Sequence, residues 1–341
     1  MNLSTYDSHL QVATFPEGEV LSLQDKRFSW GDNRRKGGKL VRLYRKSGYE
    51  LYAERAQMCA TRLQFYEMEN GEKQLMSANF CHLRLCPMCT ARRAKRAAYK
   101  LSKVLNQVEA ERPGTMFLFL TLTVKNVPGD QLGDALGQLT KAWAKLMDHR
   151  PIQRAVGGWF RALEITRNGR MYHPHIHAIL AVPPEYFSRK SGLYIPQAEW
   201  VDRWQKALGV DYKPSVRIQT AKAKGEYTGG QAAAVEAAKY AVKDSDYIDP
   251  NLPEAEAVQI VKDYTEALHR RRLTAFGGWL KNAAKALDAE NLDDGDLVHT
   301  EDETIRADIA DFITTYDWHF GAGNYVLTDK QVNPLKLERK G

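Results

Sequence analysis

Three histidines alternate with other residues inside an apolar segment, and this spacing restricts the local fold more than any other feature. His173, His175 and His177 stand in the run MYHPHIHAILAV over residues 171–182. On a β-strand, residues two positions apart point to the same face, so the spacing predicts a strand with three neighbouring imidazoles. A buried neutral imidazole needs hydrogen-bonding partners, and metal ligation satisfies that need. The segment therefore predicts a metal site on one face of a sheet.

A carboxylate comes before the histidines, on the other side of a predicted hairpin turn. Asn168-Gly169 is a strong signal for a two-residue hairpin turn between two strand-like segments. Such a turn puts position 164 opposite 173, so Glu164 shares the histidine face and lies diagonally near His175. Two imidazoles and a carboxylate suit a divalent cation such as Mn²⁺ or Mg²⁺, and they also suit Fe(II) in an oxygenase. The candidate ligands are Glu164, His173, His175 and His177.

An acid, a phenol and an ammonium share one side of the helix that the sequence predicts over 231–246. At 100° per residue, Glu236, Tyr240 and Lys243 cluster on one face together with Tyr247, away from an apolar stripe. After a metal-binding hairpin, this combination is typical of an active site. The alternative is an i,i+4 pairing of surface side chains that has no chemical role.

All four cysteines of the chain fall within 31 residues. They are Cys59, Cys81, Cys86 and Cys89, and the last three belong to the run CHLRLCPMC. A predicted hairpin turning at Asn70-Gly71 brings the first cysteine beside the second, and the CPMC knuckle completes a tetrahedron. Without a signal peptide, such confinement favours structural Zn²⁺ over disulfides. His82 is an alternative ligand, and unrelated reduced core cysteines are the alternative to a metal site.

The positive charge of the chain is concentrated in clusters. The net charge is +7, although residues 288–311 hold ten acidic residues against one base. Basic residues follow the cysteine knuckle on a predicted amphipathic helix and recur at 270–272, which favours a nucleic-acid partner over a merely solvated surface. The candidate DNA-binding residues are Arg92, Arg93, Lys95, Arg96, Lys100, Arg270, Arg271 and Arg272.

The length and composition indicate a folded protein of about two domains. The 341 residues are 43% hydrophobic, and the longest apolar run, at 116–124, is too short to cross a membrane. We therefore expect a cytoplasmic protein without membrane contact. Strand-like and helical segments around a central hairpin predict an α+β sheet domain. Four zones follow: a basic N-terminal region at 1–58, a zinc-binding module with a basic helix at 59–110, the sheet domain at 111–250 and a helical, partly acidic region at 251–341.

Three motifs in a fixed order give the chain a resemblance to a known family. FLTLTV at 119–124, HPHIH at 173–177 and ExxxYxxK at 236–243 resemble the motifs of HUH-type rolling-circle replication initiators. The likeness is greatest to plasmid initiators that use one tyrosine with a glutamate four residues before it. The cysteine knuckle and the segment at 270–287 also resemble that group. The resemblance implies an RRM-like palm of antiparallel strands with helices on one face, a small zinc module before it and a helical region after it.

The resemblance also implies a reaction and its partners. It assigns Tyr240 as the nucleophile that nicks one strand of a double-strand origin and forms a 5′-phosphotyrosine, with Lys243 favouring the phenolate. It assigns Glu236 to the activation of water for termination. The partners would be single-stranded and hairpin origin DNA, together with a host helicase and the replication machinery.

Other interpretations remain open at this point. A conjugative relaxase or a single-tyrosine transposase would use the same chemistry, but relaxases usually place the tyrosine before the histidines. A zinc-dependent DNA-binding regulator without enzymatic activity, and a metal-dependent oxygenase, are the interpretations from other classes.

Overall fold

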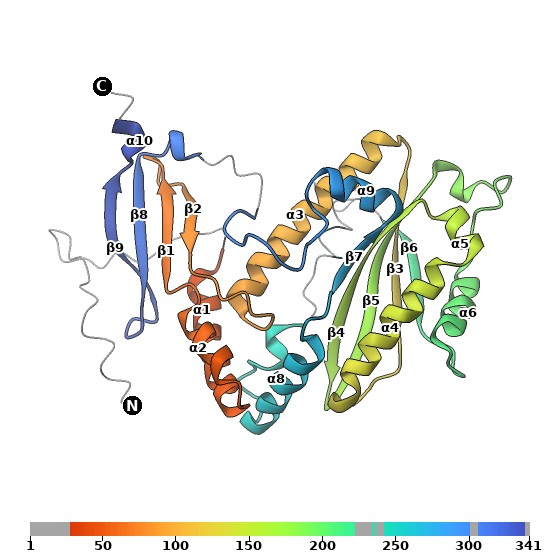
Figure 1. Cartoon of the computed structure of the whole chain (residues 1–341), viewed down its shortest axis with the longest axis horizontal. Coiled ribbons are helices and arrows are strands. Elements are labelled where there is room, and N and C mark those ends of the chain that lie inside the picture. The colour runs from red at the N-terminus through yellow and green to blue at the C-terminus, as the bar shows by residue number, and fades with distance from the viewer. Residues whose placement is uncertain (1–27, 222–233, 235–236, 238–241, 301–305, 338–341) are drawn as a thin grey trace. The chain divides into compact units, whose positions relative to one another are not determined.

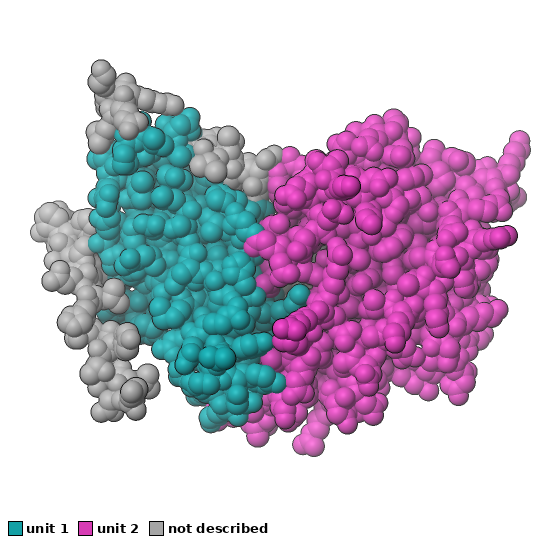
Figure 2. All heavy atoms as spheres, viewed as in Figure 1, with its two compact units in different colours: residues 1–92, 296–341 teal, residues 93–295 magenta. Residues whose placement is uncertain are grey.

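The computed structural model describes residues 28–221, 234, 237, 242–300 and 306–337. The chain forms two compact units, each considered by itself. Unit 1 comprises residues 1–92 together with 296–341, and unit 2 comprises residues 93–295 (Figure 2).

Unit 2 is built on a five-stranded antiparallel sheet with the strand order β6-β3-β5-β4-β7. The central strand β5 carries the histidines and has apolar residues along most of its length, because both of its faces are covered. The strands are β3 (Met116–Thr123), β4 (Gly158–Asn168), β5 (Met171–Val182), β6 (Val216–Thr220) and β7 (Thr274–Gly277).

Helices cover both faces of this sheet (Figure 1). On one face, Trp143 of α4 packs edge-on against Trp159 of β4, and Trp204 of α6 donates a hydrogen bond to the carbonyl of Thr123. The other face is covered by α3 and α9. The antiparallel α+β fold is thus confirmed, and helices lie on both faces of the sheet, where the resemblance implied one face. The helices of this unit are α3 (Pro87–Glu111, which begins in unit 1), α4 (Leu132–Met147), α5 (Arg150–Ala155), α6 (Gln197–Leu208), α8 (Glu254–Leu268) and α9 (Gly278–Ala286).

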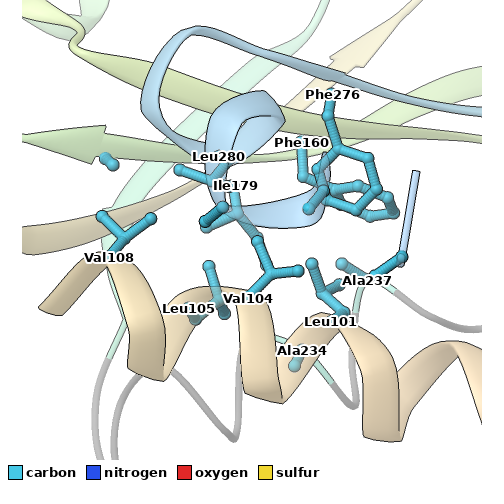
Figure 3. Close-up of a cluster of buried hydrophobic side chains, with 14 of the residues drawn as sticks. Leu101, Val104, Leu105, Val108, Phe160, Ile179, Ala234, Ala237, Phe276 and Leu280 are labelled. Atoms are coloured by element: carbon cyan, nitrogen blue, oxygen red, sulfur yellow. The ribbon is translucent and has the colours of Figure 1, made fainter. Parts of the chain in front are cut away.

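The core between α3 and the sheet contains one continuous apolar cluster (Figure 3). Leu101, Val104, Leu105 and Val108 recur at helical spacing on α3 and are fully buried. They pack with residues of the strands and of α9, namely Phe117, Phe119, Phe160, Ile179, Phe276 and Leu280. Ala234 and Ala237, both helical, complete the cluster. These two alanines therefore pack on this face of the sheet.

Two glycine pairs allow the edge of the sheet to close tightly. A Cβ on Gly277 would lie 2.2 Å from the indole of Trp159, and a Cβ on Gly157 would lie 2.2 Å from the indole of Trp279. The sequence Gly-Gly-Trp occurs at 157–159 and again at 277–279, and the tryptophan of each copy packs against the first glycine of the other. No larger side chain fits at either glycine without displacing an indole.

Unit 1 contains a four-stranded antiparallel sheet with the order β2-β1-β8-β9, in which residues 62–78 pair with residues 312–332. Arg62 of β1 makes a bidentate contact with Asp317 of β8, at 2.8 and 3.0 Å. Trp30, Tyr44 and Phe65 are buried within the unit. Its elements are α1 (Trp30–Lys46), α2 (Glu50–Met58), β1 (Arg62–Glu67), β2 (Lys73–Ala78), β8 (Phe312–His319), β9 (Asn324–Val332) and α10 (Pro334–Leu337).

The compact units divide the chain differently from the four zones expected from sequence. The region 251–341, expected to be helical, contains α8 and α9, but it also contributes β7 to the sheet of unit 2 and the β8–β9 hairpin to unit 1. The zone 59–110 is divided within α3, at Arg92. The physical reason is long-range pairing: β1 pairs with β8, about 250 residues away, and no local periodicity records such a contact.

None of the helices in the described part of the chain is both long enough and apolar enough to cross a membrane.

Candidate active site and metal centres

Glu164, His175 and His177 form one compact group on β4 and β5. Glu164 pairs directly with His175 in the sheet, and its Oε2 lies 3.5 Å from His175 Nε2 and 2.8 Å from His177 Nε2. The ligand atoms of the three residues all lie within 4.8 Å of one another. The expected carboxylate and two imidazoles therefore converge on one point.

The register of this hairpin differs by two residues from the expected one. Asn168 pairs with Met171, so Gly169 and Arg170 form the turn in place of Asn168 and Gly169. Gly169 has a φ of 60°, which suits glycine at that turn position. A shift of two keeps every side chain on its face, because side chains alternate with a period of two. Glu164 consequently faces His175 directly, where a diagonal position was expected.

Outer hydrogen bonds orient both imidazoles toward the carboxylate. His175 Nδ1 lies 3.0 Å from the carbonyl oxygen of His173, and this contact requires Nδ1–H as the donor. His177 Nδ1 lies 3.2 Å from the hydroxyl of Thr121, which pairs with His177 across β3 and β5. Each ring therefore presents Nε2 to Glu164, an arrangement common among metal-ligating histidines. Thr121 was not singled out from sequence, although its place in the FLTLTV motif opposite the histidine strand was a usable signal.

His173 lies beside this group and not within it. Its ring centroid is 5.5 Å from that of His175, and its side chain is not among the three whose ligand atoms converge. Burial and the neighbouring His175 lower the pKa of His173. Of the four candidate ligands, the geometry thus groups Glu164, His175 and His177.

The electrostatics of the group favour an ionised carboxylate. Burial alone would raise the pKa of Glu164, but hydrogen bonds from His175 and His177 outweigh it and hold the pKa well below its usual range. Glu164 and His175 are each 7% exposed. A buried anion with two nitrogen donors is a donor set that fits a divalent cation such as Mn²⁺, Mg²⁺ or Fe²⁺.

This group lies on the face of the sheet that carries the α3 cluster. His175 and His177 alternate in phase with Ile179 on β5, and the ring of Phe119 lies 5.3 Å from that of His177. Ala234 and Ala237 pack into the same cluster. Glu236 and Tyr240 themselves lie outside the described residues.

Lys243 is not part of the expected helix. Its backbone is extended, with φ −94° and ψ 137°, and it precedes a 3₁₀ turn over Asp244–Asp246. Its side chain is exposed. Tyr247 is buried, and its ring lies 6.4 Å from that of Tyr264. The helical face expected to extend from 236 to 247 is therefore interrupted at Lys243, because the chain turns before the 3₁₀ segment.

The four cysteines converge in unit 1. Cys59 Sγ lies 3.5 Å from the sulfurs of Cys86 and Cys89, and Cys81 Sγ lies 3.6 Å from that of Cys89. A tetrahedron with Zn–S bonds of about 2.3 Å has edges of about 3.8 Å, close to these separations. All four side chains are buried. Hydrogen bonds from Cys59 and the other two cysteines hold the pKa of the Cys86 thiol well below its usual value, which favours a thiolate. The group fits a closed structural metal site, and His82 is not a member of it.

Several of the cations expected to bind DNA instead hold backbone carbonyls. Arg92 is 4% exposed and donates to the carbonyls of Leu297 and Val298. Arg96 is 8% exposed and donates to those of Asn291 and Asp294. Lys100 donates to the carbonyl of Asp288. Together, these hydrogen bonds hold residues 288–298 against α3. A polyanion cannot reach a guanidinium that is buried in this way.

The remaining candidates differ in their exposure. Arg271 donates to the carbonyls of Ala267 and Gly133, and Arg272 donates to those of Thr274 and Glu290. Arg93 and Lys95 are partly buried. Arg270 and Arg272 are exposed, and no side-chain hydrogen bond engages Arg270 among the described residues.

The fold and its two clusters define the class of protein. An antiparallel α+β sheet carries a buried Glu-His-His group, and the chain has a second group of four cysteines; each group could hold a metal ion. A family model described as "Replication protein" matches residues 72–326. The chain therefore belongs to the replication protein family.

Curated relatives agree with this assignment. "Protein rep" from Streptococcus pneumoniae serotype 2 is 35% identical over 308 residues, which cover 89% of this chain and 93% of that protein. "Protein rep" from Bacillus amyloliquefaciens is 34% identical over 324 residues, covering 89% and 94%. "Protein rep" from Lactiplantibacillus plantarum is 38% identical over 256 residues, covering 73% and 80%. No solved structure matches the chain.

Proposed function

We propose that this protein initiates plasmid rolling-circle replication by nicking one strand of the double-strand origin. Tyr240 is the nucleophile, the product is a 5′-phosphotyrosine, and the released 3′-OH primes synthesis behind a host helicase. The observation that carries the proposal is the convergence of Glu164, His175 and His177 on the sheet face that also binds Ala234 and Ala237.

The three converging residues would hold the cation of the nicking reaction. A divalent ion bound there, Mn²⁺ or Mg²⁺, would supply Lewis-acid polarisation of a non-bridging phosphate oxygen. Glu164 provides the anionic ligand, and the two imidazoles are held with Nε2 toward it. The Thr121 hydroxyl and the His173 carbonyl fix the rings from outside.

Tyr240 and Glu236 would carry the two bond-making steps. The phenolic oxygen of Tyr240 attacks phosphorus, the P–O3′ bond breaks, and the leaving oxygen takes up a proton to become the 3′-OH. A free tyrosine has a pKa of about 10, so ionisation needs assistance, and Lys243 would favour the phenolate. In the terminating step, Glu236 removes a proton from water that attacks the phosphodiester. This hydrolysis prevents a second covalent round.

The chain's own spacing supports these roles. Ala237 follows Glu236 directly and lies three residues before Tyr240, and it is 2% exposed in the cluster on the site's face of the sheet. Membership of the replication protein family provides the biological setting.

The proposal is tested by separating initiation from termination. Wild-type protein and Glu236→Ala are incubated with supercoiled origin plasmid and Mn²⁺, and then with an oligonucleotide that ends the round. We expect both proteins to nick, and we expect the variant to accumulate covalent protein–DNA product. Equal termination by the two proteins would contradict the role of Glu236. Absence of nicking by the wild-type protein would contradict the proposed function as a whole.

A further inference from the structure

Two large aromatic side chains are exposed side by side on the loop between β5 and α6. Phe187 is 48% exposed and Tyr194 is 55% exposed, and their ring centroids are 5.7 Å apart. Behind them Tyr186 is 1% exposed, and its centroid lies 4.9 Å from that of Phe187 and 5.8 Å from that of Tyr194. We refer to Tyr186, Phe187 and Tyr194 as the aromatic platform. Its outer rings offer apolar surface to solvent, which costs free energy unless a ligand covers them.

The loop that carries the platform is ordered by its own hydrogen bonds. Ser191 donates through both its backbone N–H and its hydroxyl to the carbonyl of Ser188, at 3.1 and 2.8 Å. The hydroxyl of Tyr186 lies 3.3 Å from the backbone nitrogen of Ile195 and accepts its hydrogen bond. Gly192 has a φ of 64°, a conformation that favours glycine. The outer rings are therefore presented by a formed loop, so a ligand would not have to order it.

Two cations lie at the tip of the same loop. Arg189 and Lys190 are exposed between Phe187 and Tyr194, inside the Ser188–Ser191 turn. Neither has an ion pair or side-chain hydrogen bond within the described ranges. Positive charge beside exposed aromatic faces complements a ligand that has both phosphates and flat bases.

We propose that the aromatic platform, with Arg189 and Lys190, binds single-stranded DNA by base stacking. Duplex DNA is a poor ligand for it, because paired bases are stacked on one another and hide their faces. The platform follows the C-terminal end of β5, whereas the histidines lie in the first part of that strand. His177 and Val182, the last residue of β5, are five residues apart, or about 17 Å. Ile179 and Ala181, which lie between them on the histidine face, are fully buried, so a bound strand would reach the platform around the covering helices. The inference rests on the proposed function, since the platform would bind the strand that is to be nicked.

The test measures binding without cleavage. In a Tyr240→Phe background, fluorescence anisotropy reports binding of a labelled origin oligonucleotide, as a single strand and as a duplex. We expect Phe187→Leu and Tyr194→Leu each to weaken single-strand binding about fivefold or more, and to leave duplex binding unchanged. Leucine keeps the apolar bulk but lacks the π-face. Phe320→Leu, which changes another exposed ring in unit 1, is the matched control and should bind as the parent does.

A second measurement isolates the two cations. Replacing Arg189 and Lys190 with alanine should reduce the salt dependence of single-strand binding, by about 0.7 in the logarithmic slope for each phosphate that the protein no longer neutralises. Unchanged single-strand affinity in the two leucine variants would overturn the proposal, and so would an equal loss on single strand and duplex. Because the background variant lacks the Tyr240 hydroxyl, these outcomes do not depend on whether the wild-type protein nicks DNA.

Discussion

Glu164 and His177 meet across neighbouring strands, with the carboxylate Oε2 2.8 Å from the imidazole Nε2, although each pairs with a different residue in the sheet ladder. Glu164 is opposite His175, and its side chain leans along the strand toward His177. One carboxylate therefore contacts both rings from a single position. This diagonal contact brings the carboxylate oxygen and the Nε2 atoms of both histidines close together. The proposed metal binding depends on that proximity.

Removing the charge of Glu164 should weaken metal binding and leave the fold intact. In Glu164→Gln the amide cannot supply the anionic ligand, so we expect Mn²⁺ affinity to fall by about tenfold to 100-fold, a range typical even of outer partners of metal ligands. Isothermal titration calorimetry measures the affinity. The matched control is His173→Ala, whose ring lies outside the converging group, and it should retain Mn²⁺ binding. An equal loss in both variants would contradict the ligand set.

Loss of one cysteine should release the metal of unit 1 and destabilise that unit. We expect about one Zn²⁺ per chain in the purified protein by elemental analysis, and none in Cys86→Ser. Binding energy at such a site is also folding energy, so the variant should unfold at a lower temperature. A wild-type protein that binds no zinc and is as stable as the variant would contradict the structural zinc site.

The sequence predicted local features well where the chemistry depends on spacing. Alternation placed His175 and His177 on one face, and an error of two residues in the turn left Glu164 on the correct face because strand side chains have a period of two. The four cysteines lie close together in sequence, and they also converge in space.

Features set by contacts between distant segments could not be predicted in the same way. Arg92 and Arg96 look like a cationic helix face in sequence, but the carbonyls that bury them come from about 200 residues later. The strands β1 and β8 are also far apart in the sequence, and the β8–β9 hairpin lies in a region that was expected to be helical. A helical pattern reports which side of a helix is polar, but it does not report what covers that side.

Two arginines from the basic clusters should behave in opposite ways. Arg92→Ala leaves the carbonyls of Leu297 and Val298 without their buried donor, so we expect a loss of about 1–3 kcal/mol in unfolding free energy. Urea denaturation measures it. Arg270→Ala, which removes an exposed cation, should leave stability unchanged and reduce the salt slope of duplex binding by about one. Full stability in Arg92→Ala would contradict its structural role.

Acid should weaken unit 1 through Glu67. Burial opposes the charged form of this carboxyl, but hydrogen bonds from Lys330 and Lys73 outweigh it and lower its pKa. The ionised group therefore stabilises the fold above its unfolded pKa of about 4.3, and this contribution is lost as the pH falls toward the lowered folded value. Denaturation between pH 7 and pH 3 should show a smaller loss for Glu67→Gln than for wild type. Glu72→Gln, an exposed control, should follow wild type, and parallel curves for all three would contradict the linkage.

The central claim is that the hydroxyl of Tyr240 attacks the DNA backbone beside the Glu164, His175 and His177 group. The most direct measurement is an incubation of the protein with a labelled origin oligonucleotide and Mn²⁺, followed by denaturing electrophoresis and peptide mass spectrometry. The account predicts a denaturant-stable adduct on the peptide that contains Tyr240, and no adduct in Tyr240→Phe. An adduct on any other residue, or one that persists in Tyr240→Phe, would contradict it.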